Sequence, residues 1–239
     1  QSLGVVHHYL GQYAEAENRL QEGLAKAQAA ADARIEAYAL ASQGDLYRDT
    51  RRYDEALVVY RRALEIASAT QTTRLIIYLL DALGNVYRLK GDLTRARQFI
   101  MEAADQAQEG EMAYEAGLCQ LSKGIIALQE GQIANAQAWL SRASELFIQS
   151  GSRRDLARTR LYMAALAYHR GDLAESATHL RAVAGLAQEI GSHQFIVAEG
   201  PALADLLRHA EERGILGLDY IRIHAEMAEV WGGTRVGPE

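Results

Sequence analysis

The stretch ALGNVYRLKGDLTRA, residues 82–96, contains the spacing on which the fold depends. Gly84 stands seven residues before a second glycine, Gly91, and Ala96 follows five residues after that. Seven residues make about two turns of an α-helix, so Gly84 and Gly91 would belong to one helix and its end. A glycine at that end supplies the left-handed conformation with which helices commonly stop. The stretch therefore predicts a helix, a tight turn and a second helix.

The same spacing recurs every 40 residues along the chain. The turn position holds Gly11, Arg51, Gly91, Gly131 and Gly171. The small residue seven positions earlier is Gly4, Gly44, Gly84, Gly124 or Ala164. Five and nine positions after the turn stand Ala16, Ala56, Ala96, Ala136 and Ser176, and then Leu20, Tyr60, Ile100, Leu140 and Leu180. A fixed period in this range is typical of a solenoid of stacked units. Because Arg51 is not a glycine, we expect its turn to be strained or built differently.

Each unit is predicted to be an antiparallel helix pair. We expect first helices near residues 2–10, 34–50, 73–90, 112–130 and 153–170. Second helices are expected near residues 12–30, 52–69, 92–109, 132–149 and 172–190. Ser152 and Ser192 follow glycines at unit boundaries and are expected to cap the helices that come next.

The repeat breaks off in the C-terminal segment. Gly200-Pro201 is expected to stop one helix and start another, since proline is favoured in a first helical turn. An apolar stripe then runs through Leu203, Leu206, Leu207 and Ala210 up to Gly214, and a last helix is expected near residues 218–230. The sequence thus predicts two parts: five helix pairs over residues 1–192, the first truncated, and atypical C-terminal helices and a tail over residues 193–239.

Composition limits the class of protein. Of 239 residues, 49% are hydrophobic and only two are proline, which favours an all-α fold over one rich in turns. The net charge of -6 argues against non-specific nucleic-acid binding. A single cysteine, Cys119, excludes an internal disulfide framework, fits a reducing cytoplasmic compartment, and is expected to be buried. No apolar run reaches the length of a membrane span, so no membrane contact is expected.

Sequence signatures of catalysis are missing. The chain has no phosphate-binding loop with a Gly-Lys-Ser/Thr end and no His-Glu-x-x-His motif, and its seven histidines are scattered. We therefore expect no enzyme activity, no cofactor and no metal site. Trp139 lies beside the repeat position of Leu140, which favours a packing role over a platform for a ligand.

The repeat resembles a known family. Its third unit carries the residues that resemble the tetratricopeptide repeat signature: Leu83-Gly84, Tyr87, Gly91, Ala96 and Ile100. The resemblance covers roughly residues 1–190, and the period of 40, with no closing proline, fits a variety with longer helices. The predicted fold is thus an all-α, right-handed superhelical solenoid of antiparallel helix pairs.

The C-terminal segment narrows the resemblance further. The order Pro, Leu-Leu, Ala, Arg-Gly, Tyr-Ile within residues 199–230 is similar to the end of the sensor region in MalT-type, ATP-dependent regulators of the LuxR class. The resemblance implies a repeat array that lies between an N-terminal nucleotide-binding module and a C-terminal helix-turn-helix.

Candidate binding residues follow from the expected geometry. First helices of such solenoids line the concave groove, and polar or aromatic residues not used for packing should face it. These are Asp45, Arg48, Asp49, Asp81, Asn85, Arg88, Arg158, Tyr162, Tyr168 and His169. Arginine can hold a carboxylate with two parallel hydrogen bonds, and asparagine can both donate and accept. The alternative is that Asp45 and Arg48 merely pair across one helical turn.

Two classes of function remain open. The first is the sensor and interaction part of a larger signal-responsive transcriptional regulator, whose groove accepts a protein, a peptide or a small-molecule inducer. The second is a free-standing tetratricopeptide scaffold that binds a partner peptide. In neither class does this segment itself contact nucleic acid.

Overall fold

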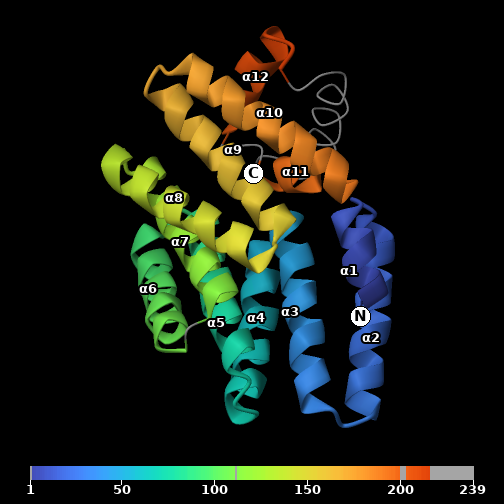
Figure 1. The fold of residues 1–239 in the computed structure, drawn as a ribbon. Coiled ribbons are helices and arrows are strands. Elements are labelled where there is room, and N and C mark those ends of the chain that lie inside the picture. The colour runs from blue at the N-terminus through green and yellow to red at the C-terminus, as the bar shows by residue number, and fades with distance from the viewer. Residues whose placement is uncertain (1, 111, 200–202, 216–239) are drawn as a thin grey trace, which may run out of the picture. The chain divides into compact units, whose positions relative to one another are not determined.

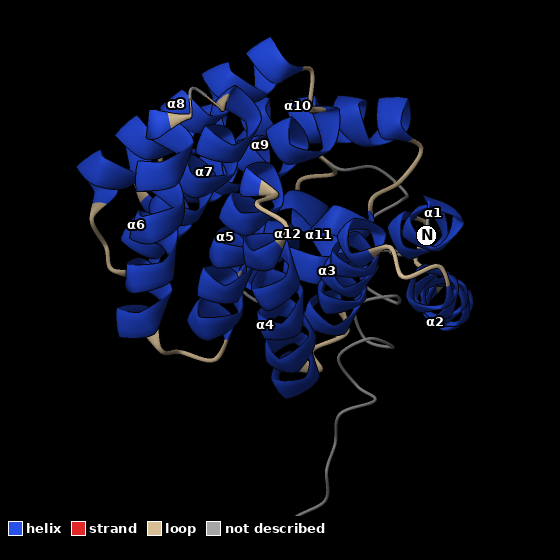
Figure 2. Cartoon of the chain, turned by 90° about the horizontal axis from the view of Figure 1, so that it is seen from below, coloured by secondary structure: helices blue, strands red, loops and turns tan. Residues whose placement is uncertain are grey.

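The computed structural model describes residues 2–110, 112–199 and 203–215. The regular elements in these ranges are α-helices, with no strand among them (Figure 2). The chain groups into two compact units, residues 1–151 and 152–239, which are described separately below. None of the described helices has both the length and the apolar character needed to cross a membrane.

The first unit contains four antiparallel helix pairs in which each helix packs against the next (Figure 1). The first helices of the pairs are α1 (Ser2–Tyr9), α3 (Ala33–Asp49), α5 (Thr73–Leu89) and α7 (Ala113–Gln129). The second helices are α2 (Tyr13–Ala29), α4 (Tyr53–Ala69), α6 (Leu93–Glu109) and α8 (Ile133–Ser150). Each predicted range agrees with the observed one within a residue at either end, so the helix-pair repeat is confirmed.

The second unit begins with the fifth helix pair, α9 (Arg153–His169) and α10 (Leu173–Ile190), and continues with α11 (Gln194–Glu199) and α12 (Ala204–Glu212). Helices α10, α11 and α12 all contact α9. The predicted apolar stripe is buried: Leu203, Leu206, Leu207 and Ala210 are each at most 4% exposed. Gly200-Pro201 and the helix expected near residues 218–230 lie outside the described residues. The division into residues 1–192 and 193–239 stays a prediction.

All five turns inside the pairs use a left-handed residue. At Gly91, φ is +84°, and at Arg51 it is +63°. The next backbone N–H donates to the carbonyl five residues earlier in both turns, from Asp92 to Tyr87 over 2.9 Å and from Arg52 to Tyr47 over 2.7 Å. The Arg51 turn is therefore built like the glycine turns. It carries the steric cost of a side chain in this region, roughly 1–2 kcal/mol.

The small residue of each unit marks the closest approach of its two helices. A Cβ atom placed on Gly84 would lie 2.6 Å from Ile100 Cγ1 and 3.0 Å from the carbonyl oxygen of Ala96. At Gly124, the same atom would lie 2.7 Å from Leu140 Cδ2. One helix crossing therefore brings together the small residue seven positions before the turn, the alanine five positions after it and the large residue nine positions after it. This shared contact explains why their spacing is fixed.

Helix starts use aspartate more than serine. Asp92 accepts a hydrogen bond from the backbone N–H of Arg95 at 3.0 Å, and Asp172 accepts one from Glu175 at 2.9 Å. Ser192 accepts from the N–H of Gln194 at 3.2 Å, as expected of a residue before α11. Ser152 occupies the predicted cap position, but its hydroxyl donates to Asp155 Oδ2 at 2.8 Å and accepts no hydrogen bond from a backbone N–H of α9.

Candidate functional site: polar side chains of the first helices

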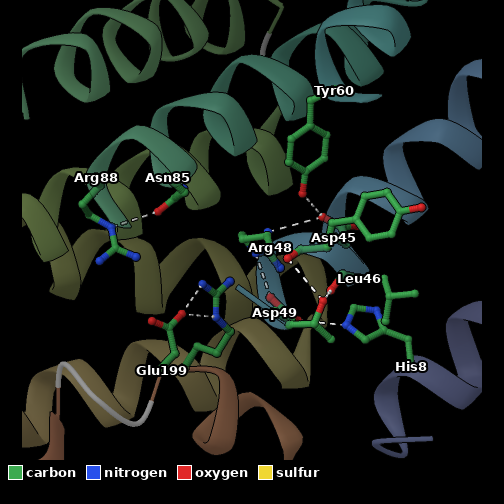
Figure 3. A network of polar contacts seen from close by, with 12 residues as sticks. His8, Asp45, Leu46, Arg48, Asp49, Tyr60, Asn85, Arg88 and Glu199 are labelled. Atoms are coloured by element: carbon green, nitrogen blue, oxygen red, sulfur yellow. Dashed lines mark hydrogen bonds and ion pairs between the residues drawn. The ribbon is translucent and has the colours of Figure 1, made fainter. Parts of the chain in front are cut away.

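A network of charged and phenolic side chains centres on Asp45 of α3 (Figure 3). Its Oδ1 accepts hydrogen bonds from the hydroxyls of Tyr60, on α4, and Tyr78, on α5, each at 2.6 Å. Arg48 Nη1 lies 3.3 Å from the same oxygen. The pairing of Asp45 with Arg48 across one helical turn is thus present, but it is one contact of several. Tyr78 links the first helices of two successive units.

The network continues from Arg48 toward the N-terminus. Arg48 Nε donates to Asp49 Oδ1 at 2.8 Å, and the other oxygen of Asp49 lies 2.9 Å from Nε2 of His8, on α1. His8 is 4% exposed and the Asp49 side chain 7%, whereas the side chains of Asp45 and Arg48 retain 21% and 16%. Asp45 and Arg48 therefore keep part of their side-chain surface accessible to an incoming ligand.

Electrostatics fix the protonation states of this network. Burial raises the pKa of the Tyr60 and Tyr78 hydroxyls, and the nearby negative charge of Asp45 raises it further. Burial opposes the charge on Arg48, but the carboxylates of Asp49 and Asp45 outweigh it, so its pKa is raised. At neutral pH, the two phenols are hydrogen-bond donors and Arg48 is a cation held between carboxylates.

A second polar group lies on α5. Asn85 Nδ2 lies 3.0 Å from both the backbone carbonyl oxygen and Oδ2 of Asp81, and 2.8 Å from the Oγ of Ser122, on α7. Arg88 Nε lies 3.3 Å from Asn85 Oδ1. All three α5 side chains are buried, with exposures of 4–7%. These residues therefore help to join α5 to α7, and a ligand would have to compete with partners already in place.

The remaining candidates lie in the second unit. Arg158 of α9 binds Glu199 of α11 with Nη2–Oε1 at 2.6 Å, and it lies 3.3 Å from Asp155. The hydroxyl of Tyr162, which is 2% exposed, donates to the other oxygen of Glu199. Glu199 thus ties α11 to α9 through two of the predicted residues.

Tyr168 and His169 stand at the end of α9. The ring of Tyr168 lies 5.2 Å from that of His209, on α12, and 6.4 Å from that of His169. Tyr168 is half-buried and His169 is exposed. Because Tyr162 points into the contact between α9 and α11, Tyr168 is the predicted tyrosine that presents its ring near the surface.

Sequence reasoning missed several partners of the predicted residues: His8, Tyr60, Tyr78, Ser122 and Glu199. Tyr60 stands nine positions after a turn, where the other units carry leucine or isoleucine, yet its ring is buried while its hydroxyl donates to Asp45. Glu199 follows the repeat, so no periodicity singles it out. Across the described residues, no three His, Cys, Asp or Glu side chains gather in a group that could hold a metal ion.

Comparison with known proteins agrees with this architecture. The family model described as the MalT-like TPR region matches residues 1–182. Among curated proteins, none matches the sequence. Solved structures also resemble the chain, at sequence identities of 14–18% in the following three, and they support the fold alone.

A Rap protein complexed with Competence and Sporulation Factor aligns with a TM-score of 0.63 and 17% identity over 95% of this chain and 63% of its own. The apo form of RapI aligns with a TM-score of 0.58 and 14% identity over 99% and 77%. BtubC from P. vanneervenii aligns with a TM-score of 0.55 and 18% identity over 77% and 76%.

Proposed function

Because the chain belongs to the MalT-like TPR region family, we propose that it is the sensor and interaction part of a larger, signal-responsive transcriptional regulator. The match to this family over residues 1–182 is the observation that carries the proposal. The segment is proposed to bind and not to catalyse, to use no cofactor, to work in the cytoplasm, and to leave contact with nucleic acid to another part of the protein. Its net charge of -6 supports the last point.

The proposed binding face is the row of polar side chains on α3 and α5. Its partly exposed members, Asp45 and Arg48, offer a carboxylate and a guanidinium whose geometry is held by Tyr60, Tyr78 and Asp49. Such preorganised groups suit a polar ligand, because little side-chain freedom is lost on binding. We propose a peptide, a protein segment or a small polar inducer as the ligand. The Rap protein solved with Competence and Sporulation Factor supports the idea that a related fold can hold a bound factor.

The alternative is a free-standing scaffold that binds a partner peptide. It is favoured by the alternation of donors and acceptors along α3 and α5, which would suit an extended peptide backbone. The gene sequence on either side of this segment distinguishes the regulator from the free-standing scaffold. A nucleotide-binding module upstream or a helix-turn-helix downstream supports the regulator, and the absence of both supports the scaffold.

Binding at this face is tested by thermal shift. Metabolites and peptides are screened for those that raise the Tm of the domain, since a ligand of the folded state stabilises it by mass action. For any ligand found, Arg48→Gln, Asn85→Ala and Arg88→Ala are each expected to weaken Kd about tenfold or more, because a hydrogen bond to a charged or buried polar group is lost. Arg62→Ala is the matched control, since Arg62 on α4 is 60% exposed and pairs only locally with Glu65.

The same variants are melted without ligand, because Asn85 and Arg88 are buried and their loss also costs stability. Arg48→Gln changes a more exposed side chain, so in this variant a loss of binding is more easily distinguished from a loss of stability. Retention of binding within twofold in all three variants, with far-ultraviolet circular dichroism unchanged, would show that the row on α3 and α5 serves structure only.

A further inference from the structure

A groove runs along α7 on the side where α6 and α8 flank it, within the first unit. It contains two adjoining cavities, an apolar one of about 290 Å³ and a more polar one of about 450 Å³. Lys123 of α7 lines both cavities and therefore marks their junction. The groove shares no residue with the polar row on α3 and α5, so it is a separate feature of the molecule.

The apolar cavity has an incompletely covered hydrophobic wall. Trp139 of α8 is half-buried there, and Met101 of α6 is 57% exposed. Ile126 and Ala127 of α7 form the floor. Trp139 therefore does more than pack beside Leu140, because its ring also forms part of a cavity surface. A cavity of this size, with an apolar wall and few polar groups, approaches the lower end of the range found for small-molecule sites.

One of the positive charges that line the apolar cavity is not compensated by a negative charge there. Arg97 of α6 forms an ion pair with Glu130, at the end of α7, so these two charges offset each other at one end. Among the residues that the structure describes, no carboxylate oxygen lies within 4 Å of the Lys123 ammonium. Although the whole chain has a net charge of -6, the side chains that line this cavity carry one more positive than negative charge, which favours binding of an anion.

The polar cavity is also lined by one carboxylate, Asp105 of α6, which is exposed to solvent and forms no ion pair with Lys123. The thiol of Cys119 is fully buried one turn earlier on α7, and burial raises its pKa, so it stays neutral. Arg142, which lines the polar cavity from α8, already pairs with Glu145 at 2.8 Å. A lysine beside an apolar wall, with no ion pair to another described residue, offers an ammonium to a carboxylate and apolar surface to the tail attached to it.

We propose that this groove binds a small organic carboxylate, with its apolar tail against Trp139 and Met101 and its carboxylate on the Lys123 ammonium. The bounded apolar cavity favours a small molecule over a longer polypeptide. The site lies on the second helices and on α7, and it is independent of the proposed polar face on α3 and α5. Failure of either proposal leaves the other intact.

Octanoate is a suitable probe, and Trp139 is the reporter. The chain has two tryptophans, so Trp231→Phe leaves Trp139 as the single source of tryptophan emission. In this background, octanoate is expected to change the emission saturably, and 1-octanol, which has the same tail and no charge, is expected to bind about tenfold more weakly, as for loss of a charged contact. This comparison needs no variant of the groove itself.

Substitution of the lysine completes the test. Lys123→Met is expected to weaken octanoate about tenfold and to leave 1-octanol unchanged, because only the charged contact is lost. Lys26→Met, on the exposed surface of α2, is the matched control and is expected to bind as the parent does. Lys123→Gln is measured in parallel, and circular dichroism checks that each variant is folded.

Three results would overturn the proposal. One is the absence of saturation by octanoate. Another is equal affinity for octanoate and 1-octanol in the Trp231→Phe protein, which would indicate non-specific apolar binding. The third is a dimer in sedimentation velocity that Met101→Ser dissociates, which would show that a second copy of the chain covers the groove.

Discussion

Ala96→Asp is expected to lower the free energy of unfolding by about 3–5 kcal/mol, as for a charge buried without a partner. Ala96 has no exposed surface, and its carbonyl oxygen stands 3.0 Å from where a Cβ atom on Gly84 would lie. The α5–α6 crossing therefore has no room for a carboxylate and no water to solvate it. Urea unfolding followed by circular dichroism measures the loss as a lower midpoint.

The fifth unit supplies a matched control for this substitution. Ser176 stands at the register of Ala96, and its hydroxyl donates to the carbonyl of Ala164 at 3.0 Å. Ala164 is the counterpart of Gly84, so a serine at position 96 can make the same hydrogen bond to the Gly84 carbonyl. Ala96→Ser is accordingly expected to change stability by less than about 1 kcal/mol, the usual net worth of one hydrogen bond. An unchanged midpoint for Ala96→Asp would mean that the repeat register is misplaced.

The sequence could predict the crossing at Gly84 and Ala96 because it depends on spacing alone. Small residues, turn residues and the large residue nine positions later are all placed by helical periodicity within one unit. The Arg51 turn was left open by the sequence, and it keeps the left-handed backbone of the glycine turns because two helices must reverse direction there. Neighbouring units repeat the same helix crossing, so the spacing in one unit predicts the structure of the next.

The candidate site was harder to predict because it depends on side chains from different units. Asn85 was expected to face the groove, but its burial against Ser122 is set by how α7 packs on α5, and Ser122 is 37 residues away in sequence. Asp45 likewise takes two tyrosine donors from other helices, and neither spacing nor composition indicates which tyrosine hydroxyl will turn toward it. The same is true of Trp139, because its position in the repeat predicts packing but does not predict the open cavity beside it.

Gly44→Ala is expected to destabilise the protein by about 2 kcal/mol, even though alanine is the better helix former. A Cβ atom on Gly44 would lie 2.5 Å from Tyr60 Cδ1 and 2.7 Å from Cζ. The ring has no exposed surface and cannot easily retreat, because its hydroxyl is held by Asp45 at 2.6 Å. A strain cost near the upper end of the usual 1–3 kcal/mol therefore exceeds the gain in helix propensity, about 1 kcal/mol.

Gly185→Ala is the control that isolates the strain. Gly185 lies inside α10, and a Cβ atom there would meet nothing within 4 Å, so only the propensity gain remains. This variant is expected to raise stability by roughly 0.5–1 kcal/mol. Two identical substitutions at two helical glycines should thus shift the urea midpoint in opposite directions. A rise in both midpoints would show that the α3–α4 crossing tolerates a methyl group, and that the glycine there is not required for close contact with Tyr60.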